Sequence, residues 1–208
     1  MGPMKQGTSP IAPMPTDLAA SDRGHEVQYY EHSRFLVTRV ADFLAPGITA
    51  GEAIIVIATP MHADLIDEEL RARDIDVAAA KRDGSFVSLD AVATLTQVMI
   101  GDRPDHGQFA SIVGGAIEQA RSRARAPIVR AFGEMVAVLW AKGRPGAALA
   151  MEDVWNDLLG HQPFSLLCGY PQSGLADADI QQVTARHTTA AVETDSPDPT
   201  PKLPIPAA

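Results

Sequence analysis

Apolar positions recur along the chain in two alternating periods, one typical of strands and one typical of helices. The run EAIIVIATP (52–60) is almost continuously apolar and β-branched, as in strands covered on both faces. By contrast, SRFLVTRVADFLAPG (33–47) repeats its apolar residues with helical spacing, from a cap at Ser33 to an expected end at Gly47. The same reading predicts strands at 25–31, 52–60, 85–90, 127–133 and 163–171, and helices at 33–47, 62–73, 91–100, 109–125, 134–140 and 147–160.

This alternation predicts an α/β fold, because strand–helix–strand units build parallel sheets through right-handed crossovers. We expect a single three-layer domain, with a mostly parallel sheet of about five or more strands and helices on both of its faces. The domain is expected to span 25–192, between proline-rich and therefore disordered segments at 1–24 and 193–208. Within the last part, AAVET (190–194) is compatible with the end of a final helix.

Composition narrows the classes of partner. The 208 residues carry a formal net charge of −9 and show no clustered basic segment, which argues against a nucleic-acid surface. No apolar stretch reaches the ~18 to 20 residues of a membrane span. The first residues also lack the basic-then-apolar order of a signal peptide. We therefore expect a cytoplasmic protein that contacts neither nucleic acid nor a membrane.

The cysteine and histidine content predicts no metal site and no cofactor. Cys168 is the single cysteine, so an intramolecular disulfide and a cysteine-rich metal site are excluded. We interpret this cysteine as a small buried hydrophobe. The six histidines are scattered along the chain without the spacing of a metal motif.

Polar and aromatic residues follow the predicted strands, at the edge where open α/β sheets bind ligands. Ordinary structural roles also account for several of them. Thr59 and Asp90 are suitable helix caps, and Glu134 suits the first turn of a helix, where the dipole favours a carboxylate. The candidate ligand-binding residues are Tyr30, Glu31, Thr59, His62, Arg130, Glu134, Glu152, Trp155 and Tyr170.

Two charged residues stand within apolar patterns and need a partner. Arg130 lies inside the predicted strand PIVRAFG (127–133), and Glu152 falls on the apolar face of the helix at 147–160, near Trp155. One interpretation is a buried ion pair of Arg130 with Glu152 or Glu134. The alternative is a polar pocket lined by Arg130 and these carboxylates and walled by Trp155.

Several segments together resemble one known family. These are HEVQYYE, FLAPGITAGEAIIVIATPMH, RARDIDVAAAKRDGSFVSLDA, PIVRAFGEMVAVLW, MEDVWNDL and HQPFSLLCGYP. In this order they resemble the MEDS domain, the DcmR-like sensory domain of methanogens and methylotrophs, over about residues 24–172. The resemblance implies a signal-input domain related to RecA- and KaiC-type P-loop proteins. The chain departs from the ATPase pattern, because HSRF (32–35) has neither the glycines nor the lysine of a P-loop.

The resemblance implies a non-catalytic sensory domain that binds a small molecule and signals to a histidine kinase, an anti-sigma factor or a transcription regulator. With no P-loop, no nucleophile elbow and no metalloprotease motif, the sequence gives no direct sign of catalysis. Two alternatives stay open. One is a degenerate P-loop nucleotide-binding protein or enzyme that uses Glu134 as a base, and the other is an adaptor that binds proteins without any ligand.

Overall fold

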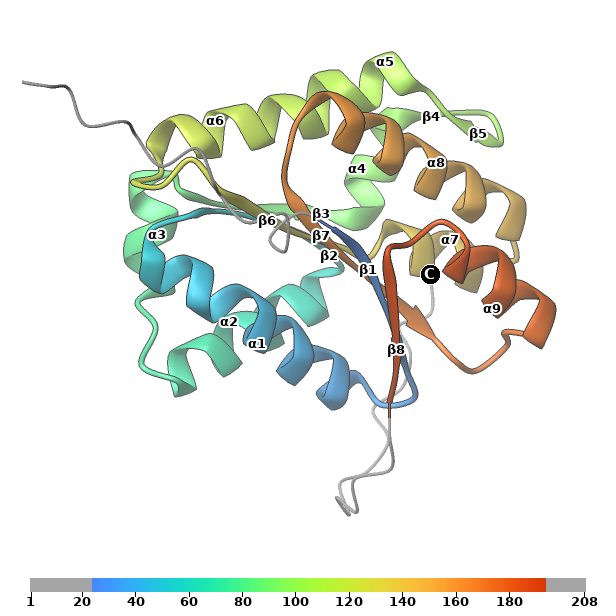
Figure 1. The fold of residues 1–208 in the computed structure, drawn as a ribbon, viewed down its shortest axis with the longest axis horizontal. Coiled ribbons are helices and arrows are strands. Elements are labelled where there is room, and N and C mark those ends of the chain that lie inside the picture. The colour runs from blue at the N-terminus through green and yellow to red at the C-terminus, as the bar shows by residue number, and fades with distance from the viewer. Residues whose placement is uncertain (1–23, 194–208) are drawn as a thin grey trace, which may run out of the picture.

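Six strands pair in parallel to form the sheet at the centre of the computed structural model, which describes residues 24–193 (Figure 1). Their order across the sheet is β3-β2-β6-β7-β1-β8, and every neighbouring pair is parallel. Parallel neighbours require a crossover connection, which explains why helices separate these strands along the chain. The strands are β1 (His25–Tyr30), β2 (Ala53–Ala58), β3 (Phe86–Asp90), β6 (Val129–Gly133), β7 (Ser165–Pro171) and β8 (Thr189–Val192).

Helices cover both faces of the sheet, as expected for a three-layer α/β domain (Figure 1). One face is covered by α1 (Ser33–Ala50), α2 (Pro60–Ala72) and α3 (Val77–Asp83). The other is covered by α4 (Ala91–Val98), α5 (His106–Phe109), the π-helical turn η2 (Ala110–Gly114), α6 (Gly115–Arg123), α7 (Met135–Ala141), α8 (Pro145–His161) and α9 (Asp177–Thr184). A short antiparallel hairpin, β4 (Met99–Ile100) and β5 (Arg103–Pro104), precedes α5.

The central strands are apolar because both of their faces are buried. All six residues of β2 are buried, and they alternate between the two cores. Ile54 packs with α1 and α2, whereas Ile55 packs with the helices of the opposite face. This arrangement explains the unbroken β-branched run in the sequence.

The predicted end of the first helix differs from the structure. Helix α1 continues past Gly47 to Ala50 and closes at Gly51, whose φ of 79° lies in the left-handed region. Gly47 is needed for a different reason. A Cβ atom there would lie 2.7 Å from Oε2 of Glu52 and 2.8 Å from Arg130.

The segment that follows α9 forms a strand, whereas the sequence suggested the last turn of a helix. Residues Thr189–Val192 pair with β1, so that Tyr29 lies opposite Val192. All four residues of β8 are exposed, because this strand forms one edge of the sheet. An exposed edge strand lacks the apolar alternation that reveals inner strands, and the sequence pattern missed it.

The predicted disordered segments 1–24 and 193–208 lie outside the described residues, apart from Gly24 and Glu193. Glu193 follows β8 and accepts hydrogen bonds at Oε2 from the backbone N–H groups of Glu31 (2.5 Å) and His32 (3.0 Å). Among the described residues, no helix is long and apolar enough to cross a membrane.

Candidate functional site

Three of the predicted site residues meet at the carboxyl edge of the sheet, where β2 and β6 end. Oε2 of Glu134 accepts hydrogen bonds from the backbone N–H of Thr59 (2.8 Å) and from its hydroxyl (3.2 Å). Oε1 of Glu134 lies 2.5 Å from Nδ1 of His62, in the first turn of α2. We call Thr59, His62 and Glu134 the carboxyl-edge cluster. All three residues are buried.

The observed contacts of these residues differ from the structural roles that the sequence suggested. Thr59 occupies the N-cap position of α2, but its hydroxyl donates to Glu134 instead of capping the helix. His62 points into the protein and is 1% exposed. Its Nε2 is buried and has no hydrogen-bond partner within residues 24–193. By contrast, Asp90 caps α4 as predicted, accepting from the N–H of Ala93 at 2.7 Å.

Tyr30 lies at the end of β1 on the same face as α1. Burial raises the pKa of its hydroxyl above the ordinary value, and the negative charge of Glu134 raises this pKa further. The hydroxyl of Tyr30 is therefore a neutral group near the carboxyl-edge cluster. Glu31, the next residue, is exposed and contributes its backbone N–H to Glu193.

A second polar group lies in the opposite core and involves two other predicted residues. Oε1 of Glu152 accepts a hydrogen bond from the hydroxyl of Tyr170 at 2.8 Å. Oε2 of Glu152 lies 3.2 Å from Nε2 of His25 and 3.6 Å from the sulfur of Cys168. Nε2 of His187 lies 3.5 Å from Oε1 of the same carboxylate. We call His25, Glu152, Cys168 and His187 the buried centre.

The charge state of the buried centre follows from its surroundings. Burial raises the pKa of Glu152. The hydrogen bond from His25 and the charges of the two histidines lower this pKa by more than burial raises it, so the net shift is downward. Burial, followed by the charge of Glu152, raises the pKa of the Cys168 thiol well above its usual value. Burial lowers the pKa of His187. At neutral pH, Glu152 is therefore a carboxylate, Cys168 is a thiol and His187 is neutral.

Arg130 pairs with Glu52 rather than with Glu152 or Glu134. Its Nε donates to Oε2 of Glu52 at 2.6 Å, and its Nη2 lies 3.4 Å from Oε1 of the same carboxylate. Arg130 lies opposite Ile54 in the pairing of β6 with β2, and Glu52 precedes Ile54 by two residues. Glu52 therefore projects from the same face of the sheet at a diagonal position. The ion pair lies towards the amino edge of the sheet, away from the carboxyl-edge cluster.

Trp155 is likewise separate from the carboxyl-edge cluster. It is fully buried in the core, where its ring packs edge-on against Phe109 with centroids 4.8 Å apart. Its indole lies against Gly133 of β6, where an added Cβ would lie 3.3 Å from the ring. The predicted set is therefore divided among the carboxyl-edge cluster, the buried centre, the amino-edge ion pair and the core.

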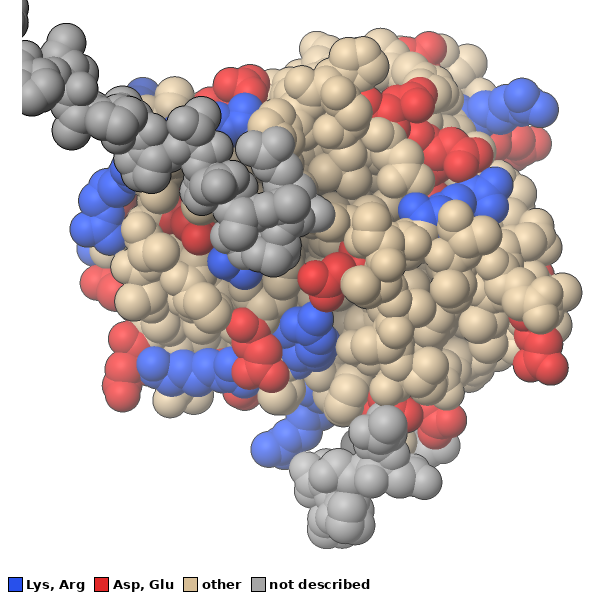
Figure 2. Space-filling view, in the orientation of Figure 1, with Lys and Arg blue, Asp and Glu red and all other residues tan. Residues whose placement is uncertain are grey.

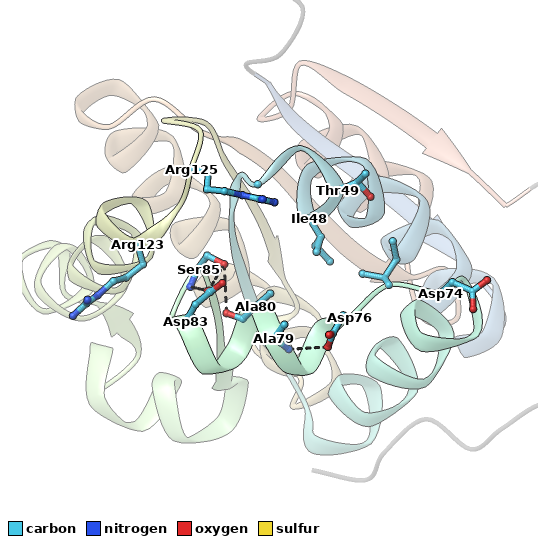
Figure 3. A pocket seen from close by; sticks show the side chains of 12 residues that line it. Ile48, Thr49, Asp74, Asp76, Ala79, Ala80, Asp83, Ser85, Arg123 and Arg125 are labelled. Atoms are coloured by element: carbon cyan, nitrogen blue, oxygen red, sulfur yellow. Dashed lines mark hydrogen bonds between the residues drawn. The ribbon is translucent and has the colours of Figure 1, made fainter.

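Two clefts open at the amino edge of the sheet rather than at its carboxyl edge. The first, of about 280 Å³, lies beside the starts of β2 and β3 (Figure 3). Two of its acidic side chains accept hydrogen bonds from nearby backbone N–H groups. Asp76 accepts from the N–H of Ala79, and Asp83 accepts from that of Ser85. The second cleft, of about 470 Å³, is lined partly by His25, Asn156 and Thr188.

Charged side chains of both signs are mixed over the face shown in Figure 2, without an extended basic patch on that face. This distribution agrees with the net charge of −9.

The sequence pattern missed the buried centre because its members come from four separate elements. His25 opens β1, Glu152 lies on α8, Cys168 lies on β7, and His187 follows α9. Their proximity depends on the pairing of β1 with β7, which places Val27 opposite Cys168. The one available signal was the charge of Glu152 on an apolar helix face.

The comparison with known families finds one family that matches most of the chain. The family MEDS, described as the MEthanogen/methylotroph, DcmR Sensory domain, matches residues 24–188, which is most of the chain and nearly all of its described part. No curated protein sequence matches the chain. The chain belongs to the MEDS family of sensory domains.

Proposed function

We propose that this sensory domain binds a small molecule at the carboxyl-edge cluster and signals its presence to a partner protein without catalysing a reaction. The observation that carries the proposal is the buried Nε2 of His62, which has no hydrogen-bond partner among the described residues. A buried polar atom without a partner costs about 1 to 3 kcal/mol, so it favours a molecule that supplies the missing hydrogen bond.

The geometry indicates the chemistry of the ligand. Nδ1 of His62 faces the carboxylate of Glu134 at 2.5 Å and therefore carries the proton. In the neutral imidazole, Nε2 is then a hydrogen-bond acceptor. A small ligand with a hydroxyl or N–H group would complete the cluster, and the neutral hydroxyl of Tyr30 would lie nearby.

Because the cluster is buried, ligand binding there would be coupled to a conformational change that a partner can detect. Thr59 and His62 are at most 7% exposed, so a ligand can reach them only if the start of α2 moves. A ligand that binds the opened form more tightly shifts the population towards that form. The partner, a histidine kinase, an anti-sigma factor or a transcription regulator, would distinguish the two forms.

The hydrogen bonds of Glu134 favour sensing over catalysis. Its carboxylate is already bonded to two groups of Thr59 and to His62. A general base must instead have a free oxygen within reach of the substrate proton. The enzyme alternative would require these bonds to break. The adaptor alternative would function without any bound molecule.

A thermal-shift screen of the purified chain tests the proposal. The probes are small alcohols, polyols and amides, each added to the wild type and to the variant His62→Gln. We expect at least one probe to raise Tm of the wild type but not of His62→Gln. The matched control is His106→Gln, because the side chain of His106 is 61% exposed and lies outside the cluster. Equal shifts in the wild type and His62→Gln, or no shift with any probe, would contradict binding at this cluster.

A further inference from the structure

The buried centre combines four side chains of the types that bind transition metals. His25, Glu152, Cys168 and His187 each offer one ligand atom, and these atoms all lie within 4.8 Å of one another. The side chains of His25, Glu152 and His187 are at most 2% exposed, and Cys168 is fully buried. The carboxyl-edge cluster shares no residue with this group, so the inference does not depend on the proposed ligand site.

Three of the separations between the ligand atoms match the edges of a small coordination tetrahedron. With bonds of about 2.0 to 2.3 Å from Zn²⁺ to N, O and S ligands, neighbouring ligands lie about 3.3 to 3.7 Å apart. In the buried centre, Nε2 of His25 lies 3.2 Å from Oε2 of Glu152 and 3.3 Å from the sulfur of Cys168. The sulfur lies 3.6 Å from Oε2 of Glu152. These three atoms thus have the spacing of one face of such a tetrahedron, and the ligand atom of His187 lies within 4.8 Å of the others.

Hydrogen bonds outside the centre orient both imidazole rings. Nδ1 of His25 lies 2.9 Å from Oδ1 of Asn156, whose Nδ2 donates to the carbonyl of Arg186. The amide is therefore oriented with its oxygen towards His25, and Nδ1 of His25 carries a proton. Nδ1 of His187 similarly lies 2.7 Å from the carbonyl of Val183. Both rings are held with Nε2 facing the centre, as in metal sites whose histidines bind a second polar partner.

One buried atom of the centre has no hydrogen-bond partner. Nε2 of His187 makes no hydrogen bond, although the side chain is fully buried. Its nearest charged neighbour is Oε1 of Glu152, which already accepts from Tyr170. A cation between this buried, unpartnered nitrogen and the carboxylate of Glu152 would satisfy both groups.

We propose that the buried centre binds one divalent transition-metal ion, and the geometry points to Zn²⁺ held by Nε2 of His25, Nε2 of His187, the sulfur of Cys168 and Glu152. A carboxylate and a thiolate would neutralise the two charges of the ion. Binding would release to solvent the thiol proton and the proton that Nε2 of His25 donates to Glu152. The mixed set of N, O and S ligands suits Zn²⁺ and its neighbours in the first transition row. Mg²⁺ and Ca²⁺ instead prefer oxygen ligands.

The cleft of about 470 Å³ provides an access route to this centre. It is lined by His25 and by Asn156, which holds the imidazole of His25 in place. An ion entering from this side would meet His25 first. Once bound, it would tie α8 and the segment after α9 to strands β1 and β7.

Cobalt and zinc binding to the full chain test the proposal. The chain is dialysed against a chelator under reducing conditions and then titrated with Co²⁺ or Zn²⁺ alone. We expect one equivalent of Co²⁺ to give a near-ultraviolet thiolate-to-metal absorption band together with the intense visible bands of tetrahedral cobalt. We expect Zn²⁺ to displace the cobalt and to raise Tm through preferential binding to the folded chain.

Four variants separate a metal site from a polar core network. Cys168→Ala should lose the thiolate band, and Asn156→Ala should weaken Zn²⁺ binding by about 10- to 100-fold, as for other partners of metal-bound histidines. His187→Gln should weaken binding by more than Asn156→Ala does. The matched control is His161→Gln, which lies in the same cleft but outside the centre and should bind as the wild type does.

Folding of each variant is checked by circular dichroism, so that a lost band is not confused with a lost fold. If Cys168→Ala does not fold, His187→Gln provides the same test through its zinc affinity. The proposal is overturned if folded, chelator-treated wild type gives no thiolate band with Co²⁺. It is also overturned if Cys168→Ala or His187→Gln binds the ions as tightly as the wild type and the His161→Gln control do.

Discussion

Arg130 and Glu52 form a two-point ion pair that joins the start of β6 to the residue preceding β2. The pair is half-buried, with 22% of the Arg130 side chain and 7% of the Glu52 side chain exposed. Arg130 also lies over the ring of Phe43, with its guanidinium carbon 5.6 Å from the ring centroid. The charge that stands out in the sequence is therefore neutralised locally.

We predict that Arg130→Met lowers the free energy of unfolding by about 2 kcal/mol, because it leaves the nearly buried carboxylate of Glu52 without its partner. The double variant Arg130→Met/Glu52→Gln should recover part of this loss. Urea denaturation of the three proteins measures both effects. The control Arg39→Met breaks an ion pair with Glu26 that is about one-third exposed, and should cost less than ~1 kcal/mol. An equal cost for the two arginine variants would contradict the structural role of Arg130.

The contrast between Arg130 and β2 shows what the sequence can predict. The burial of β2 on both faces follows from its own residues, because an unbroken apolar run has no polar face to present to water. The partner of Arg130 depends instead on which strands are neighbours. Periodicity identifies strands but not their order in the sheet, so Glu52 could not be distinguished from Glu134 or Glu152.

The candidate sites were predicted unevenly for the same reason. Thr59, His62 and Glu134 follow strands β2 and β6, which are neighbours, so the rule that ligands bind at the carboxyl edge brought them together. His25 and His187 belong to no local pattern. They meet Glu152 only because β1 lies between β7 and β8, and β8 is an exposed edge strand without apolar alternation.

The last strand provides a test of where the folded domain ends. We predict that deletion of 194–208 leaves Tm unchanged, whereas deletion of 189–208 lowers it by about 4 to 8 °C. The longer deletion removes β8, which pairs with β1 from Glu26 to Tyr29, and it costs at least ~2 kcal/mol on the usual scale for a domain of this size. Differential scanning calorimetry of the two truncated proteins makes the comparison. Equal melting temperatures would show that β8 contributes little.

Glu193, the residue after β8, is bonded to the residues just before α1, and its contribution to stability depends on pH. Burial raises the pKa of this carboxyl. Hydrogen bonds from the backbone of Glu31 and from His32 lower this pKa by more than burial raises it, so the net shift is downward. A lowered pKa in the folded state means that the stabilisation is present above the unfolded pKa of about 4.3 and is lost as the pH falls through the folded value.

We therefore predict that Glu193→Gln lowers the free energy of unfolding by about 1 kcal/mol at pH 7, the usual contribution of a carboxylate at a helix N-terminus. The difference from the wild type should shrink as the pH falls from 5 to 3. Urea denaturation at several pH values measures it, and Glu68→Gln, an exposed carboxylate on α2, is the control. A difference that stays constant down to pH 3 would argue against a role for the charge.

The same carboxylate explains why we predict no ATP hydrolysis. P-loop proteins bind phosphate at the N-terminus of the helix that follows a strand, through backbone N–H groups and a lysine. Here the end of the β1–α1 turn and the first residues of α1 read HSRF (32–35), and Oε2 of Glu193 accepts hydrogen bonds from the N–H groups of Glu31 and His32. A phosphate near this position would meet a negative charge and no lysine. We expect no phosphate release from ATP and Mg²⁺ above the background of a mock purification. Stoichiometric turnover that is lost on Glu134→Gln would instead establish the enzyme alternative.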